Sequence, residues 1–481
     1  MKKGARKSPT EEPLLFTIDP EPAKESLTSY GGIPLVVKAF RALGVGESVK
    51  RNVKLKERER GFDEATMVES FVILNACGGD YLDDFDHLRE DEGLAELIGH
   101  KLPSASAARK FLYGFHQEEK IEEAKQQLLP TEIAYVPEES EELRGLGQTR
   151  DDLVKEFGRR KPQETKATVD QDATIIESKK REALLTYEGE KGYQPMLCVW
   201  AETGLILADE FRDGNVPAIM SPLCAARIAF NSLPESVEEY CFRGDSACHE
   251  SELINWLKDE QREGGVKGKI GFAISARMSA ALRGTIINGV SEKEWHRYGD
   301  EDREVIQECA DVVFVSSEEA KSVDGQPLRY VAIRRRKKQG ELFADGSEVK
   351  YHAIVSNIWN RKADDLVVWQ RQKAGTIEAI NNIIKNELAG GVMPCGRFGA
   401  NAAWLRLTVI SHNVITAMKH LALPKELLKA RPKRLRFLIF NTAGRVLHHA
   451  RKMILRLATT TERLTIYWVQ AMKLLESTDV V

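Results

Sequence analysis

Two carboxylates, Asp170 and Asp172, lie in the apolar stretch TVDQDATIIES, residues 168–178. The neighbouring Val, Ala, Thr and Ile residues favour a β-strand. Because the side-chain period of a strand is two, both aspartates point to the same face. Like charges on one half-buried face repel each other and are costly to desolvate. A hard divalent cation would turn that repulsion into attraction, because its preferred ligands are oxygens.

Two further acids, Asp245 and Glu378, occupy positions from which they could complete such a site. Asp245 ends the apolar stretch VEEYCFRGD, residues 237–245, and Glu378 lies within the predicted helix AGTIEAINNIIKNEL, residues 374–388. An acid on one strand, an acid at the end of its neighbour and an acid on a helix packed across the sheet can lie within a few ångströms. Two Mg²⁺ ions about 4 Å apart, or Mn²⁺ in their place, would then hold the attacking and leaving oxygens of a phosphoryl displacement. Strand parity leaves either Asp170 or Asp172 as the first ligand.

The surrounding elements predict a mixed sheet with helices on its faces. Five strands are expected, within residues 165–176, 193–201, 205–212, 237–245 and 269–276. The first three form an antiparallel meander, and helices over 217–233 and 249–261 separate the last two. Short strand-like runs over 311–317, 328–335 and 351–359 then predict a β-rich insertion before the helix of Glu378. The fold class is therefore α/β.

Composition is that of an ordinary protein of several domains, with 481 residues, 42% of them hydrophobic, and a net charge of −3. No stretch approaches a membrane span, and MKKGARKSPTEEP lacks the apolar run of a signal peptide. Seven cysteines without a C-x-x-C pair favour reduced thiols in a cytoplasmic protein. Cys241, Cys248 and His249 are the nearest approach to a metal cluster, and we interpret them as packing residues. The expected order of regions is a disordered tail (1–29), a helical DNA-binding domain (30–135), a linker (136–165), the first core part (166–284), the β-rich insertion (285–360), the second core part (361–424) and a basic helical C-terminal region (425–481).

The chain resembles the DDE transposases of bacterial insertion sequences, which have an RNase H-like catalytic core. The resemblance rests on D-x-T at 172–174, on GD at 244–245, on YEGEKGYQPMLCVWAETGLILADEFRDGN at 187–215 and on KAGTIEAINNIIKNELAGGVMPCGRFGANAAWLRL at 373–407. It implies that Asp172, Asp245 and Glu378 are the catalytic metal ligands, since a small residue and a threonine follow Asp172. Asp170 would then be a neighbouring or surface group.

Related transposases with a β-strand insertion carry the signature Y-(2)-R-(3)-E-(6)-K. Lys385 stands seven residues after Glu378 and matches it, two helical turns along the same face, where it can meet a DNA phosphate. The arginine position, four before Glu378, is Ala374, so Lys373 or Arg371 would supply the upstream DNA contact.

The resemblance implies a transposase that binds terminal inverted repeats, cuts one DNA strand with Mg²⁺ and joins the new 3′-OH to target DNA. Pairing of two element ends implies a homodimer or a larger synaptic assembly. Further DNA contacts are predicted in two basic runs, at Arg334, Arg335, Arg336, Lys433, Arg434 and Arg436. Trp295 and Trp359 are either base-stacking residues or core residues of the insertion. Two alternatives are an RNase H-like nuclease without strand transfer and a DNA-binding regulator with an inactive core.

Overall fold

A nine-stranded mixed sheet organises the chain in the computed structural model, which describes residues 21, 25–55, 61–299, 304–316, 327–338, 341–458 and 462–477. Its strand order is β10-β11-β12-β13-β9-β8-β2-β6-β7. The five strands that form its catalytic half are β2 (Lys166–Ala173), β6 (Met196–Trp200), β7 (Leu205–Glu210), β8 (Glu239–Gly244) and β9 (Ile270–Ser275).

These five strands have the RNase H-like arrangement. Strand β2 pairs antiparallel with β6, which pairs antiparallel with β7, while β8 runs parallel to β2 and β9 runs parallel to β8. Each strand lies inside its predicted range, because alternating or continuous runs of apolar residues mark all five. The predicted fold class, an α/β protein with an RNase H-like core, is confirmed.

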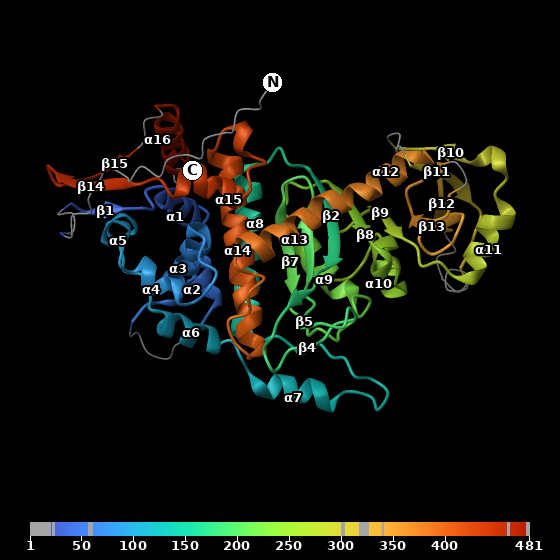
Figure 1. Ribbon diagram of the computed structural model, residues 1–481, viewed down its shortest axis with the longest axis horizontal. Coiled ribbons are helices and arrows are strands. Elements are labelled where there is room, and N and C mark those ends of the chain that lie inside the picture. The colour runs from blue at the N-terminus through green and yellow to red at the C-terminus, as the bar shows by residue number, and fades with distance from the viewer. Residues whose placement is uncertain are drawn as a thin grey trace, which may run out of the picture.

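Helices cover both faces of this sheet. On one face, α9 (Pro222–Ser232) receives a hydrogen bond from Gln171 of β2 at the carbonyl oxygen of Pro222. On the other face lie α12 (Ala363–Lys373), a π-helical turn (Ala374–Glu378) and α13 (Ala379–Glu387). Figure 1 shows α12 and α13 running across the strands. Both Asp170 and Asp172 point toward that second face, as strand parity predicts.

The β-rich insertion extends the central sheet and is not a separate unit. Its strands are β10 (His296–Arg297), β11 (Val305–Val312), β12 (Arg329–Lys337) and β13 (Val349–Ser356), and α11 (Ala280–Gly289) precedes them. Strand β13 pairs antiparallel with β9, which joins the insertion to the catalytic half through backbone hydrogen bonds. The strand predicted over 311–317 ends at Val312 and begins earlier, at Val305.

The predicted linker over 136–165 is instead the helix α8 (Glu141–Arg160), with Ser140 as its N-cap. Its buried residues include Leu143, Leu146, Leu153 and Phe157. They pack on α14 (Phe398–Ala422), the 25-residue helix that Figure 1 shows between the N-terminal helices and the sheet. Many charged residues on the exposed face of α8 hide this apolar stripe in the sequence, so the linker prediction is wrong.

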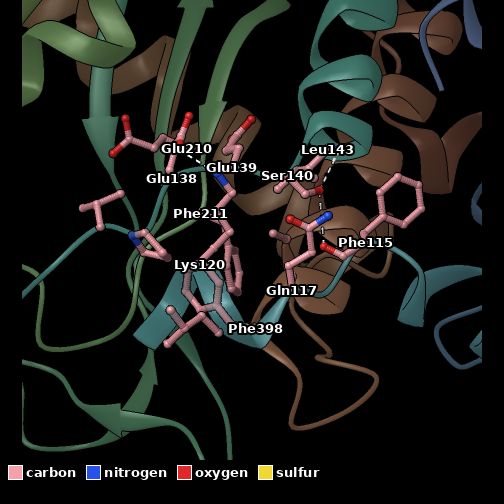
Figure 2. A pocket seen from close by; sticks show the side chains of 15 residues that line it. Phe115, Gln117, Lys120, Glu138, Glu139, Ser140, Leu143, Glu210, Phe211 and Phe398 are labelled. Atoms are coloured by element: carbon pink, nitrogen blue, oxygen red, sulfur yellow. Dashed lines mark hydrogen bonds and ion pairs between the residues drawn. The ribbon is translucent and has the colours of Figure 1, made fainter. Parts of the chain in front are cut away.

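The N-terminal helices share their core with α14. These helices are α1 (Ile33–Ala42), α2 (Val45–Asn52), α3 (Glu64–Cys77), α4 (Asp84–Leu88), α5 (Glu92–Ile98), α6 (Ala105–Tyr113) and α7 (Glu118–Gln126). The buried amide of Asn75 donates to Ser411 at 3.0 Å, and the rings of Phe71 and Trp404 lie 5.9 Å apart. Figure 2 shows a pocket at the start of α14 that Phe115, Phe211 and Phe398 line from three distant segments of the chain.

A buried ion-pair network joins α8, β7 and α14. Asp209 of β7 accepts from Arg150 at 2.5 Å and from Arg406 at 2.8 Å, and Arg406 also binds Glu139 at 2.7 Å. Asp209 and both arginines are almost completely buried. These ion pairs join the helices α8 and α14 to β7, the edge strand of the sheet.

The C-terminal region contains strands as well as helices, so its prediction as helical is wrong in part. After α15 (Pro432–Leu435) and a π-helical turn (Arg436–Phe440), a hairpin of β14 (Gly444–His449) and β15 (Lys452–Leu457) precedes α16 (Glu462–Ser477). Strand β14 pairs with β1 (Leu27–Thr28), which lies in the predicted disordered tail. Residues 1–20 and 22–24 of that tail lie outside the described residues. None of the helices in the described part of the chain is long and apolar enough to cross a membrane.

Candidate active site

Asp172 lies near the end of β2, and Asp245 directly follows β8, the parallel neighbour of β2. Gln171 of β2 stands opposite Gly244 of β8, and each aspartate is the residue that follows in the chain. Burial raises the pKa of Asp172 above its ordinary value, the charge of Lys373 opposes that rise, and the negative charge of Asp245 adds to it. The Asp245 carboxylate also accepts a hydrogen bond from the amide of Ala247 at 3.0 Å. The charge of Asp245 therefore acts on Asp172 where the carboxyl ends of β2 and β8 meet, here termed the acidic edge of the sheet.

Asp170 has a different environment from Asp172. Both of its oxygens accept from the guanidinium of Arg243, at 2.6 and 2.8 Å, and the pair is buried. Arg243 also donates to the carbonyl oxygen of Trp369 on α12. Asp170 is therefore committed to a structural ion pair, whereas Asp172 reaches the sheet edge with its side chain 19% exposed. This difference favours Asp172 as the first ligand.

Lys373 is buried against Asp172, with its ammonium nitrogen 3.3 Å from the carboxylate oxygen Oδ1. It ends α12 directly before the π-helical turn. A π-helix bonds residue i to i+5 and takes up one more residue than an α-helical turn. Lys373, five before Glu378, thus stands one turn ahead of it, where an α-helix would place Ala374.

Gln370 stands three residues before Lys373, about one turn earlier on the same helix α12. Gln370 is buried and its amide donates to the carbonyl oxygen of Gly244 and to Ser275, each at 3.1 Å. It therefore holds α12 against the ends of β8 and β9, beside Asp245.

Glu378 ends the π-helical turn, which packs against β2 and β6. Its side chain is exposed. Within the described residues, no three His, Cys, Asp or Glu side chains are close enough together to hold a metal ion. The structure therefore brings Asp172 and Asp245 together, with Glu378 nearby on the helix and outside that pair.

The donor set of this edge suits a hard divalent cation. Two half-buried carboxylates lie close together there, and the ammonium group of Lys373 contacts one of them, Asp172. Oxygen ligands of this kind are those that Mg²⁺ and Mn²⁺ take in proteins.

Lys385 lies on α13 and its ammonium donates to the carbonyl oxygen of Ile175 at 3.1 Å. Ile175 follows the end of β2, so this bond ties α13 to the strand of Asp172. An ammonium group has three donors, and the half-buried position of Lys385 leaves part of it at the surface.

The three arginines predicted from the insertion have different surroundings. Arg334 is buried, bound to Glu308 at 2.7 Å and Glu292 at 2.6 Å, and lies 4.4 Å over the ring of Trp295. Arg336 pairs with Glu308 as well. Arg334 and Arg336 thus hold the insertion together.

Arg335 instead lines a groove of about 630 Å³ that adjoins Asp245, here termed the arginine groove. Arg277, Arg371 and His352 also line it. Burial lowers the pKa of Arg371, and the nearby charge of Arg335 contributes to that shift. Burial lowers the pKa of His352, and the positive charges of Arg371 and Arg335 lower it further. The groove therefore gathers positive charge next to the acidic edge.

The basic C-terminal run, residues 433–436, also contains both exposed and partly buried cations. Lys433 and Arg434 are exposed, and Arg434 lies 5.7 Å over the ring of Phe437, which is 80% exposed. Arg436 is turned inward and donates to the carbonyl oxygens of Asn75, Ala76 and Glu387. Arg436 therefore joins α3 to α13, unlike its two neighbours at the surface.

Sequence reasoning missed two kinds of residue near the acids. Arg277 follows the end of β9 and His352 lies within β13, and neither segment carries a local signal of a shared groove. Tyr187, on the turn between β4 (Leu184–Leu185) and β5 (Lys191–Tyr193), is 77% exposed. Partial burial and Glu188 raise its pKa, and the charges of Asp172 and Asp245 add to that rise. The sequence alone does not show that the hairpin of Tyr187 lies beside the two aspartates.

The two candidate tryptophans of the insertion separate clearly. Trp295 is 9% exposed and packs between Arg334 and Tyr351. Trp359 is 60% exposed but follows the end of β13, which runs antiparallel to β9 and so ends away from Asp245. Trp359 therefore lies at the opposite end of the sheet from the acids.

Trp295→Ala is expected to destabilise the protein by about 3–5 kcal/mol, because it leaves a cavity under Arg334. Trp359→Ala is expected to change stability by less than about 1 kcal/mol, because its ring is mostly solvated. Urea unfolding of both variants measures the difference. Equal stability of the two variants would contradict the assignment of Trp295 to the core.

Comparison with known proteins supplies the family. No curated protein matches the chain. Among solved structures, a piggyBac transposase synaptic complex with hairpin DNA is similar, at 12% identity and a TM-score of 0.44, over 84% of this chain and 78% of that one. The family model for transposase DDE domain group 1 matches residues 22–478, nearly the whole chain, and the protein therefore belongs to this family of DDE transposases.

Proposed function

We propose that this transposase binds the terminal inverted repeats of its own element, cuts one DNA strand at each end with divalent metal, and transfers the new 3′-OH to target DNA. The observation that carries the proposal is the pair Asp172 and Asp245, adjacent at the ends of parallel strands β2 and β8 in an RNase H-like sheet. Mg²⁺, or Mn²⁺ in its place, supplies the activation of water and of the attacking hydroxyl in such chemistry.

We assign metal-binding, positioning and phosphate-binding roles to separate residues of the site. Asp172, Asp245 and Glu378 hold the metal ions, with Glu378 joining the pair from the neighbouring helix. Gln370 and the Asp170–Arg243 pair fix α12 on the sheet and so keep that helix in register with the two aspartates. Lys385 anchors α13 to the end of β2 and offers its remaining donors to a phosphate.

The arginine groove supports a path for DNA beside the acids. Arg335 and Arg371 both line the groove, the charge of Arg335 acts on Arg371, and the buried Nε of Arg335 has no hydrogen-bond partner. A phosphate between the two guanidiniums would relieve their repulsion and satisfy that donor. Arg371 is held in place by Gln307 at 2.5 Å and by the ring of Tyr298.

The proposed reaction is tested with the full chain and the DNA that flanks its gene. Matching inverted repeats on both sides, nicked by the protein in Mg²⁺ and joined to a target plasmid, would establish transposition. Because two ends must be paired, the active species is proposed to be a dimer or a larger assembly. Nicked product without joined product would identify a nuclease, and sequence-specific binding without any nick would identify a regulator.

The exposed basic run is expected to contact DNA phosphates. Lys433→Ala and Arg434→Ala should each weaken binding of end DNA and of scrambled DNA by similar factors, because phosphates carry no sequence information. Each loss should also reduce the slope of log affinity against log salt concentration by about 0.9. Fluorescence anisotropy at several salt concentrations measures both quantities.

Arg227→Ala is the matched control, since Arg227 is exposed on α9 at the other face of the sheet. Its salt slope should equal that of the wild type. Unchanged slopes for Lys433→Ala and Arg434→Ala would remove the C-terminal run from the DNA interface.

A further inference from the structure

Lys373 is the cation in direct contact with Asp172. Its ammonium nitrogen lies 3.3 Å from Asp172, and its side chain is only 9% exposed. Its charge also acts on Asp170 and on Cys248, the buried cysteine whose amide bonds to the carbonyl oxygen of Asp245. Lys373 therefore stands over the ends of both β2 and β8.

The carboxylates at this edge have different cationic neighbours. Arg243 pairs with Asp170, Lys373 contacts Asp172, and the arginines of the arginine groove lie beside Asp245. Asp172 and Asp245 together carry a charge of −2, and Lys373 is the cation in direct contact with this pair, through Asp172. A divalent cation matches a charge of −2, and it repels an ammonium group within a few ångströms strongly.

We infer that Lys373 is a built-in counter-ion that stabilises the metal-free active site and sets how tightly that site binds a divalent cation. This inference rests on the proposed metal site. The ion pair with the ammonium group holds the Asp172 carboxylate in place before metal arrives. Metal entry then requires the ammonium group to yield its contact with Asp172, so the apparent metal affinity is lowered by the strength of that ion pair. The π-helical turn that follows Lys373 places it there.

The test compares Lys373→Met with the wild type in the absence of DNA. Methionine keeps the length of the side chain and removes the charge. Titration calorimetry with MnCl₂ is expected to show at least about tenfold tighter binding to the variant. In metal-free buffer the melting temperature of the variant should fall below that of the wild type, and saturating MnCl₂ should raise it more than it raises that of the wild type. Affinity equal to or weaker than that of the wild type would overturn the inference.

Three further variants make the result unambiguous. Lys373→Gln tests the same loss of charge if the methionine variant does not fold, and Lys373→Arg, which keeps the charge, should not bind Mn²⁺ more tightly than the wild type. Lys166→Met is the matched control, because Lys166 pairs with Glu239 at 2.6 Å at the other end of β2 and β8 and should leave Mn²⁺ affinity unchanged.

Loss of Mn²⁺ binding in Asp172→Asn and Asp245→Asn, with no gain in the lysine variants, would overturn this inference and leave the proposed metal site intact. Undiminished Mn²⁺ binding in both aspartate variants would instead overturn the metal site and this inference with it.

Discussion

Asp172→Ala and Asp245→Ala are each expected to lower the rate of strand cleavage in Mg²⁺ by at least about a thousandfold. Loss of a metal-holding carboxylate removes about 4 kcal/mol or more of transition-state stabilisation. Binding of end DNA should be largely retained, because the proposed DNA contacts lie on other segments. A gel assay of nicked end DNA, with anisotropy on the same preparations, measures both properties.

Asp365→Ala is the control for this experiment, since Asp365 is an exposed acid at the start of α12. It should cleave at the wild-type rate. Near wild-type cleavage by Asp172→Ala or Asp245→Ala would exclude that residue as a metal ligand. Glu378→Ala should be as inactive as the other two, which would show that Glu378 joins them when metal and DNA are bound. Asp170→Asn, in contrast, should lower stability, because it removes the charge that Arg243 pairs with.

Asp209→Ala is expected to destabilise the fold by about 3–5 kcal/mol. The substitution leaves Arg150 and Arg406 buried without the carboxylate that they share, and an uncompensated buried charge is costly. Urea unfolding of the metal-free protein measures the change in unfolding free energy.

Glu239→Ala provides the comparison, because Glu239 forms an exposed pair with Lys166 and should cost at most about 1 kcal/mol. Similar losses in the two variants would mean that the Asp209 network contributes little beyond an ordinary surface ion pair.

The catalytic half of the sheet could be predicted from the sequence, because each of its strands carries its own apolar pattern. Asp172 could be placed on one strand and Asp245 at the end of its neighbour for the same reason. Helix α8 could not, since its stripe of leucines is diluted by charged residues on the opposite face. The C-terminal hairpin was hidden by its basic residues, and its partner β1 comes from the other end of the chain.

Residue roles near the acids depended on contacts that spacing does not reveal. One extra residue in the π-helical turn moves Lys373 onto Asp172, which turns a predicted DNA contact into a partner of the first acid. Arg334 and Arg335 are adjacent in sequence and point to opposite faces of β12, so one is neutralised by Glu308 and Glu292 while the other lines the arginine groove. A run of basic residues in a sequence therefore does not show which of its cations form ion pairs within the protein.

The pairing of β1 with β14 also constrains how the protein is made. Leu27 and Thr28 pair with Arg445 and Gly444, so the partner of this N-terminal strand leaves the ribosome about 416 residues later (444 − 28). The strand cannot form this pairing until residues 444 and 445 have been made, and closing so long a loop is a slow step. A nascent chain that stops before residue 444 therefore leaves an open strand edge prone to pair with other chains.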